Sequence, residues 1–249
     1  MKPEALLATF EAAADAAADA LRPLEGSDRR ARTDRHGQYA LDLVADAAVL
    51  PLLLATGAAI VSEESGRHGP DDAPITIVVD PVDGSTNCAR GIPYWSISIC
   101  ALDADGPLCG FVANQATGER FTAVRGKGAF CDSRPVVPSG VTRVEDSVVA
   151  FAGMPAQKLP WKQFRALGSA ALTLCDVADG RVDGFVDGLG DVHKPWDYLG
   201  GLLVCQEAGA FVVDARGREL LTTSDDARRT LLAASTPELM EQLRPLAAT

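Results

Sequence analysis

The stretch Val78–Asn87 reads VVDPVDGSTN and places two aspartates at the end of an apolar, strand-like run. Asp80 ends that run and Asp83 follows three residues later, while Pro81 between them keeps the chain from entering a helix at that point. One interpretation is that Asp83 caps a helix and that Asp80 is a loop residue. The other is that both carboxylates and the carbonyl of Val82 hold a hard cation such as Mg²⁺.

The neighbouring sequence favours a cation site. The three residues that follow the second aspartate are Gly84, Ser85 and Thr86. They would open a helix whose free N–H groups can bind a phosphate, so that a metal site and an anion site would share one turn. Acids also stand elsewhere at the edges of expected elements: Glu63 and Glu64 follow an apolar run, and Asp197 opens an apolar helical segment. Each acid alone is more typical of a cap or a solvated charge, but together they predict a metal-dependent phosphatase.

Composition narrows the classes of partner and location. The 249-residue chain has a net charge of −11, whereas nucleic-acid binding depends on a basic surface, so we expect no nucleic-acid partner. The six cysteines form no CxxC pair, which predicts small buried thiols in a reducing cytosol. The N-terminal segment lacks the pattern of a signal peptide, and the apolar stretch 47–60 is too short to span a bilayer. We therefore expect a cytoplasmic protein with no membrane partner.

Periodicity along the chain predicts two halves of different type. Apolar spacing indicates helices over 3–21 and over 38–59, the second interrupted near Pro51. Short β-rich runs between 94 and 130, separated by Gly-containing turns, indicate antiparallel hairpins. Beyond a linker at 135–140, strand and helix alternate. We predict an N-terminal α+β half over residues 1–137 with the main metal motif, and a C-terminal α/β half over residues 138–249 with the last acid and the substrate-recognition segments.

The motifs together resemble a known family. The segment DPVDGSTN, with SEES upstream and WDYLGGLLVCQEAGA downstream, is similar to the inositol monophosphatase family of lithium-sensitive, Mg²⁺-dependent phosphatases. The intermediate segment RALGSAALTLCDVADGRVDGFVD fits the same family, and the resemblance extends from about residue 38 to 240. It implies a layered αβαβα sandwich of the inositol monophosphatase and fructose-1,6-bisphosphatase type, with the site between the halves. It also implies a homodimer.

The resemblance assigns roles to particular residues. The implied ligands of two or three Mg²⁺ ions are Glu63, Asp80, the Val82 carbonyl, Asp83 and Asp197. The implied phosphate cradle is the backbone of Gly84, Ser85 and Thr86. In the family the hydroxyl that matches Ser85 pairs with an upstream aspartate and orients or deprotonates the attacking water. Asp46 is the residue we assign to this role, and Asp42, one helical turn away, is the alternative.

In the family an acid between the penultimate strand and the WD motif binds a substrate hydroxyl, and this segment offers Asp187 and Asp191. Ser169 and Asp187 are the residues we assign to substrate hydroxyls, with a helix cap and a turn as their structural alternatives. His193 and Lys194 would lie at the rim.

The expected reaction is the Mg²⁺-dependent hydrolysis of a small phosphate monoester, an inositol phosphate or a related polyol or sugar phosphate. Within the family the alternatives are fructose-1,6-bisphosphatase, histidinol-phosphate phosphatase and 3′-phosphoadenosine-5′-phosphate phosphatase activities. A non-catalytic metal- or phosphate-binding scaffold is the alternative from another class.

Overall fold

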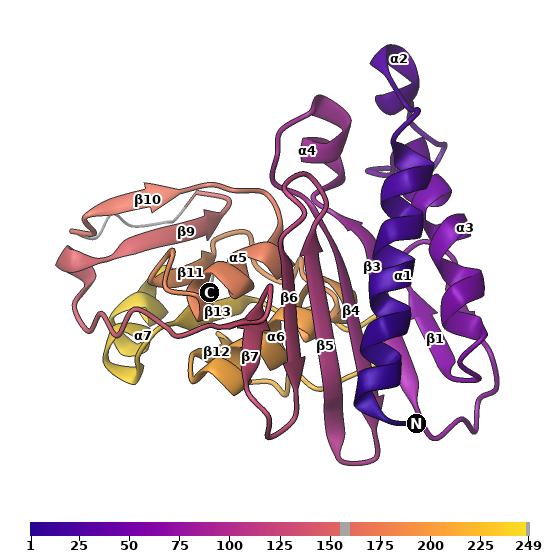
Figure 1. Cartoon of the computed structure of the whole chain (residues 1–249). Helices are drawn as coiled ribbons and strands as arrows, with labels where there is room; N and C mark the ends of the chain where they lie inside the picture. The colour runs from indigo at the N-terminus through magenta and orange to yellow at the C-terminus, as the bar shows by residue number, and fades with distance from the viewer. Residues whose placement is uncertain (155–159, 248–249) are drawn as a thin grey trace.

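The computed structural model describes residues 1–154 and 160–247, which form two sheets with helices on their faces (Figure 1). The larger sheet has the strand order β2-β1-β3-β4-β5-β6-β7-β8. Its strands are β1 (Ala59–Ser62), β2 (Gly66–His68), β3 (Thr76–Asp83), β4 (Ser96–Asp103), β5 (Gly106–Asn114), β6 (Arg120–Val124), β7 (Ala129–Cys131) and β8 (Arg134–Pro135). Strands β4 to β7 pair in antiparallel succession, which confirms the predicted hairpins. Strands β1 and β3 run parallel.

The smaller sheet has the strand order β10-β9-β11-β13-β12. Its strands are β9 (Val148–Ala152), β10 (Gln163–Arg165), β11 (Gly184–Asp187), β12 (Phe211–Asp214) and β13 (Leu231–Ala234). Strands β9 and β11 run parallel, so their carboxyl ends meet at one edge of the sheet. This edge faces the site described below.

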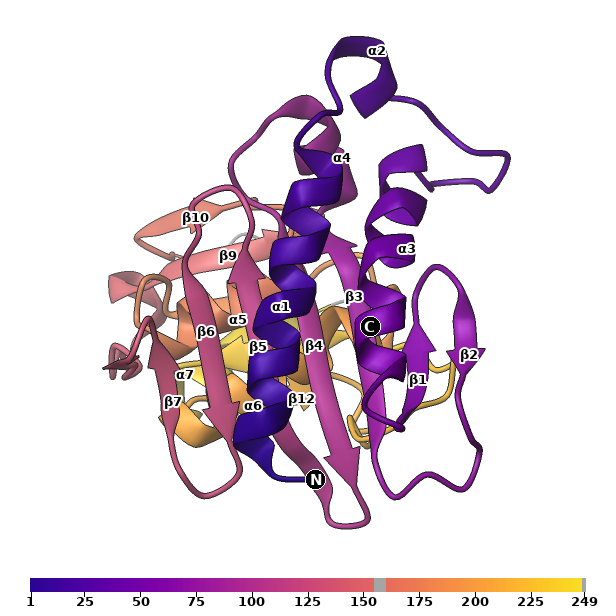
Figure 2. The same cartoon turned by 45° about the vertical axis from the view of Figure 1, so that its right-hand side comes forward.

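Helices cover both sheets and fill the space between them. They are α1 (Pro3–Leu21), α2 (Gly26–Arg29), α3 (Ala40–Leu54), α4 (Ser85–Arg90), α5 (Ala170–Ala178), α6 (Pro195–Ala208) and α7 (Pro237–Leu243), with short 3₁₀ turns at Val144–Asp146 and Arg244–Leu246. Helices α1 and α3 pack on one face of the larger sheet, and α5 and α6 contact strands of both sheets (Figures 1 and 2). Helix α7 packs on β11 and β13. The predicted layered αβαβα sandwich is therefore confirmed.

The helices over the larger sheet follow the apolar pattern of the sequence. Helix α1 has the predicted bounds and buries Leu6, Phe10 and Leu21 on one face. The second predicted helix was too long, since α3 ends at Leu54. It continues through Pro51, whose ring lies on the exposed face near the helix end, where water can satisfy the carbonyl that the proline leaves free. The predicted interruption near this proline is therefore wrong. After the helix the chain turns and enters β1.

The interior matches the expectations for thiols and aromatic residues. All six cysteines are free and buried, as predicted. Trp95 and Trp196 are buried in the apolar cores on the two faces of the larger sheet. Among the residues that the structure describes, no helix has both the length and the apolar character needed to cross a membrane.

The two sheets come from successive parts of the chain. Strand β8 of the larger sheet ends at Pro135 and β9 of the smaller sheet begins at Val148. Helix α6, from the second half, nevertheless packs on β3, β4 and β5 of the first. The domain boundary between residues 137 and 138 stays a prediction.

Candidate active site

The motif at the end of β3 is an irregular strand end followed by a short helix. The pairing of β3 with β4 shifts between Asp80 and Asp83, so the strand bulges there. The backbone N–H of Val82 donates to Asp80 Oδ1 at 2.9 Å. Gly84 then turns the chain at φ +92°, where a Cβ atom would lie 2.9 Å from the carbonyl oxygen of Gly168. Only glycine fits this position, which explains why the motif carries one.

Three predicted ligands converge at this strand end. Glu63, Asp80 and Asp197 each place one carboxylate oxygen within 4.8 Å of the others. Glu63 directly follows β1, which runs parallel to β3, and its N–H donates to the carbonyl of Val79 at 3.1 Å; this pairing sets it beside Asp80. Asp197 arrives from the first turn of α6, where it accepts from the N–H of Lys194 at 2.6 Å. Residues far apart in sequence thus form one acidic cluster.

The electrostatics of this cluster fit a bound cation. Burial, and then the charge of Asp197, raise the pKa of Glu63 well above its usual value. Burial, and then the charge of Glu63, do the same for Asp80, and burial raises the pKa of Asp197. Arg35 forms its ion pair with Glu64, at 3.5 Å, and not with these three carboxylates. A divalent cation would offset their repulsion, and three hard carboxylate oxygens are the donors that Mg²⁺ prefers.

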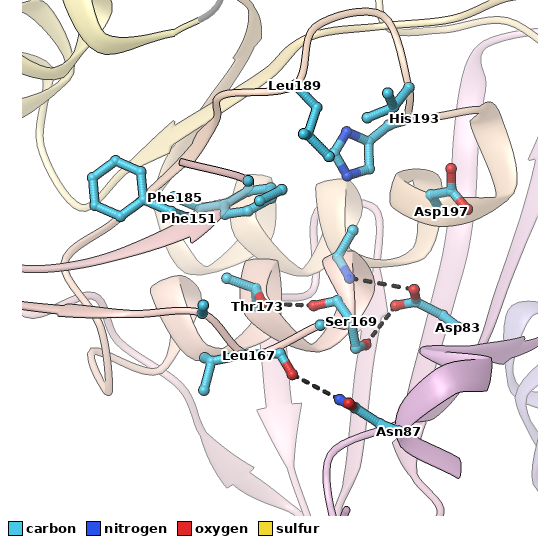
Figure 3. A pocket seen from close by; sticks show the side chains of 16 residues that line it. Asp83, Asn87, Phe151, Leu167, Ser169, Thr173, Phe185, Leu189, His193 and Asp197 are labelled. Carbon is cyan, nitrogen blue, oxygen red and sulfur yellow. Dashed lines mark hydrogen bonds between the residues drawn. The ribbon is translucent and has the colours of Figure 1, made fainter. Parts of the chain in front are cut away.

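Asp83 lies beside this cluster and is held by the start of α5. Its carboxylate accepts from Ser169 Oγ at 2.5 Å and from the N–H groups of Ala170 and Ala171 at 3.3 and 2.8 Å. Burial, and then the charge of Asp197, raise the pKa of Asp83 to about 6, although these hydrogen bonds oppose the shift. Asp83 and Asp197 line the same side of one cleft (Figure 3). The carboxylate of Asp83 therefore links the end of β3 in the larger sheet to the start of α5.

The predicted phosphate cradle is the first turn of α4. Gly84 is its N-cap, and Ser85 and Thr86 are its first two residues, whose N–H groups have no acceptor within the helix. Tyr39 donates to Thr86 Oγ1 at 3.4 Å. Asn87 donates through Nδ2 to the carbonyl of Leu167 at 2.7 Å, which ties α4 to the segment before α5.

The two acids considered as the partner of Ser85 differ in their contacts. Asp46 accepts from Ser62 Oγ at 2.5 Å and is thereby bound to β1. Asp42, one turn earlier, accepts from the N–H of Tyr39 through Oδ2 at 2.8 Å, while its buried Oδ1 has no partner among the described residues. Burial raises the pKa of Asp42 to about 6, although the hydrogen bond from Tyr39 and the nearby Ser85 side chain oppose the shift. Asp42, the alternative, is therefore the preferred candidate for the partner of Ser85.

The substrate side of the cleft also differs from the prediction. Asp187 has no exposed surface, and its Oδ1 accepts from the N–H groups of Leu189 and Gly190 at 2.7 and 3.1 Å. Its Oδ2 is hydrogen-bonded to Nδ1 of His193 at 3.0 Å. Both oxygens are thus occupied, so Asp187 is a turn residue and not a free substrate ligand. Ser169 lines the cleft, but it is the N-cap of α5 and its hydroxyl is held by Asp83.

His193 lines the cleft in place of Asp187 (Figure 3). Burial lowers the pKa of this imidazole, but the hydrogen bond to Asp187 and the charge of Asp197 outweigh burial and raise it above its usual value. The cleft has a volume of about 470 Å³ and runs from the acidic cluster to the ends of β9 and β11. A cavity of this size holds a small phosphorylated molecule.

The whole chain was compared with known proteins. The model of the inositol monophosphatase family matches residues 2–248. The chain belongs to the inositol monophosphatase family. It is 32% identical over 214 residues to a fructose-1,6-bisphosphatase/inositol-1-monophosphatase of Archaeoglobus fulgidus, covering 82% of this chain and 83% of the relative. It is 34% identical over 205 residues to the Nus factor SuhB of Pasteurella multocida, covering 74% and 71%.

Solved structures show the same fold. A hypothetical protein of Pyrococcus horikoshii with similarities for inositol-1 monophosphatase superposes over the full length of both chains with a TM-score of 0.89 and 24% identity. The family and the Archaeoglobus relative are named as phosphatases, which supports a phosphatase as the enzyme class of this member.

Two residues of the site were named from the sequence without their place being fixed. The helix start near Asp42 is hard to read because its N-cap is Tyr39 and not one of the usual capping residues, although the acid at the N3 position was a readable signal. His193 was placed only at the rim, since nothing local in the sequence reveals that Asp187 folds back to hold its ring. That contact depends on the turn at Gly188–Asp191.

Proposed function

We propose that this member of the family is a Mg²⁺-dependent phosphomonoesterase that acts on a small phosphorylated metabolite. The observation that carries the proposal is the convergence of Glu63, Asp80 and Asp197 within 4.8 Å, beside the first turn of α4. The names of relatives make inositol phosphates and other polyol or sugar phosphates the first esters to test. The expected enzyme is a cytoplasmic homodimer, and its net charge of −11 disfavours a nucleic-acid partner.

The reaction is the attack of water on phosphorus. The water oxygen bonds to phosphorus, the bond from phosphorus to the ester oxygen breaks, and the alcohol leaves with a proton. The residues that would hold two or three Mg²⁺ ions are Glu63, Asp80, the Val82 carbonyl, Asp83 and Asp197. When bound, the metal would supply an acidified water and neutralise charge on the phosphoryl group.

The protein groups around the phosphorus have distinct tasks. The free N–H groups of Ser85 and Thr86 at the start of α4 bind phosphoryl oxygens. The Ser85 hydroxyl, 3.0 Å from the Val82 carbonyl and close to Asp42, orients the attacking water. Asp42, with its free Oδ1 and a pKa of about 6, is ionised near neutral pH and accepts the proton that the water loses.

The test is phosphate release from a panel of monoesters with and without Mg²⁺. The panel contains inositol 1-phosphate, fructose 1,6-bisphosphate, histidinol phosphate and 3′-phosphoadenosine-5′-phosphate. We expect Mg²⁺-dependent release that Glu63→Gln abolishes and that Glu11→Gln, a matched change on the exposed side of α1, leaves intact. Absence of release from every ester by folded, Mg²⁺-loaded protein would overturn the proposal. It would favour the non-catalytic scaffold, a role that relatives named Nus factor SuhB make worth testing.

A further inference from the structure

We infer that the alcohol released by this phosphatase presents an apolar ring to the cleft and not a ring of free hydroxyls. The inference rests on the proposed function and specifies its substrate class. Asp83 and Asp197 occupy one side of the cleft, and the opposite side is apolar (Figure 3). We call this opposite side the apolar wall; its residues are Phe185, Leu189 and Val192. A phosphate held at the acidic side directs its alcohol toward this wall.

The apolar wall is built by two segments that pack closely. Phe185 comes from β11 and is 3% exposed, so it forms the buried base of the wall. Leu189 lies against Gly153, where a Cβ atom would be 2.5 Å from the leucine Cδ2. Leu189 itself is 61% exposed and Val192 is 38% exposed. Apolar side chains thus continue from the base of the cleft to its mouth, where an apolar ligand would remove them from water.

The polar side chains of the cleft are already engaged. Ser169 donates to Asp83 at 2.5 Å, and Thr173 donates to the carbonyl of Ser169 at 2.5 Å. Asn87 uses Nδ2 for the carbonyls of Tyr94 and Leu167, both at 2.7 Å. An inositol ring buried here would lose water from several hydroxyls and find few side-chain partners in return, Asn87 Oδ1 and His193 Nε2 among them. Each unpaired buried hydroxyl is costly, whereas an apolar ring loses nothing by the same transfer.

His193 is the exception on this side. Its Nδ1 is fixed by Asp187 at 3.0 Å, and its Nε2 has no hydrogen-bond partner among the described residues. The imidazole packs edge-to-face on Phe185 with ring centroids 5.9 Å apart. The wall therefore offers one hydrogen-bonding atom beside an aromatic face. This suits an alcohol with an apolar ring and one polar atom.

A matched pair of esters tests this directly. Cyclohexyl phosphate and myo-inositol 1-phosphate share a six-membered ring and a ring-carbon ester, and differ in the ring hydroxyls. Inositol is the more acidic alcohol, so leaving-group chemistry alone favours its ester. We expect kcat/KM for cyclohexyl phosphate to exceed that for inositol 1-phosphate by about 10-fold or more, because an apolar pocket favours the ring without hydroxyls. A preference for inositol 1-phosphate would overturn the inference while leaving the phosphatase function intact.

A variant of the apolar wall tests whether Leu189 contacts the alcohol of the substrate. Leu189→Ser should lower kcat/KM for cyclohexyl phosphate about 10-fold through KM and lower kcat/KM for inositol 1-phosphate clearly less. The control is Leu221→Ser, a leucine that is 45% exposed and lies outside the cleft lining. Both leucines are at the surface, so both variants should fold. An equal effect of Leu189→Ser on the two esters would contradict a substrate-facing wall.

Binding separates failure of this inference from failure of the proposed function. Calorimetry with cyclohexylphosphonate and the corresponding inositol phosphonate, neither of which can be hydrolysed, needs no turnover. If no ester is hydrolysed, the proposed function fails. The wall is still supported if cyclohexylphosphonate binds more tightly than the inositol phosphonate and if Leu189→Ser weakens the binding of cyclohexylphosphonate. If both phosphonates bind equally, the wall selects nothing and the inference is wrong.

Discussion

The two sides of the cleft differ in how their carboxylates are paired. The acidic side gathers Glu63, Asp80 and Asp197 from β1, β3 and α6, and burial raises the pKa of each carboxyl. The apolar side has one buried carboxylate, Asp187, whose oxygens are fully used in holding a loop and the ring of His193.

The difference shows what each side requires of the fold. Unsatisfied, mutually repelling carboxylates destabilise the apo protein and are retained for a ligand. A satisfied carboxylate such as Asp187 stabilises its surroundings and leaves the adjacent surface free for packing. Neutralising an acid should therefore have different effects on the two sides. On the acidic side it should reduce activity without reducing stability, and on the apolar side it should reduce stability and substrate affinity.

The largest effect is expected at the acidic side. Asp80→Asn removes a ligand of the proposed Mg²⁺ site and should lower kcat about 1,000-fold, as loss of metal-supplied stabilisation does. Because it also removes a repelling charge, the metal-free variant should unfold at a temperature equal to or above that of the wild type. Phosphate-release kinetics and calorimetric unfolding measure the two quantities.

Asp15→Asn, an exposed change on α1, is the control for that experiment, and both quantities should stay at the wild-type value. A sharp fall in the unfolding temperature of metal-free Asp80→Asn would show that this carboxylate supports the fold, and the contrast between the two sides would be lost.

The pH dependence of stability sharpens the contrast. Burial raises the pKa of both Asp42 and Asp83 to about 6 in the folded protein, so between about pH 4 and 6 the folded state holds protons that the unfolded chain has lost. The free energy of unfolding of metal-free protein should therefore fall as pH rises through this window, by up to about 3 kcal/mol per group. Urea unfolding after dialysis against a metal-free buffer measures it.

Added Mg²⁺ should remove this fall, because the cation binds the ionised carboxylates and stabilises the folded state. Metal-free stability that rises steadily across the same window would contradict the pKa directions given for this side of the cleft. The Asp42→Asn and Asp83→Asn variants should each flatten the curve.

Within the acidic side, the two helix acids should differ. Asp42→Asn removes the preferred partner of Ser85 and should lower kcat about 100-fold, which is typical of a lost general base. Asp46→Asn disturbs only the bond from Ser62, so kcat should change less than about threefold while the free energy of unfolding falls by about 1 kcal/mol. The reverse order of the two kcat values would restore Asp46 as the partner of Ser85.

The acidic side could be predicted from sequence because its residues stand where elements begin or end. Strand β3 ends in the motif DPVDGST with Asp80 and Asp83, Glu63 follows β1, and Asp197 opens α6, so the positions of four acids at element ends could be read from the sequence. The choice between Asp46 and Asp42 could not be made from the sequence for a physical reason. Both lie on one face of α3, and only packing decides that Ser62 engages Asp46.

The apolar side could not be predicted in the same way. His193 packs on Phe185, and Leu189 meets Gly153, only once the loop after β11 folds back. For Asp187 the sequence left a substrate ligand and a turn residue as alternatives, and it could not decide between them. Layers and strand types follow from local periodicity, whereas the lining of a cleft depends on contacts between distant segments.

The smallest effect, and the closest test of the contrast, uses two acids of one loop. Asp187→Asn weakens the support of His193 and of the turn that carries Leu189, so KM for an apolar ester should rise about 10-fold while kcat changes less than about threefold. Asp191→Asn is the matched control, because Asp191 pairs with Arg216 and Arg218 away from the cleft lining, and KM should not change. If Asp187→Asn instead lowered kcat as far as Asp42→Asn does, Asp187 would act at the phosphate. The apolar side would then belong to the catalytic machinery, and the cleft would have one functional side.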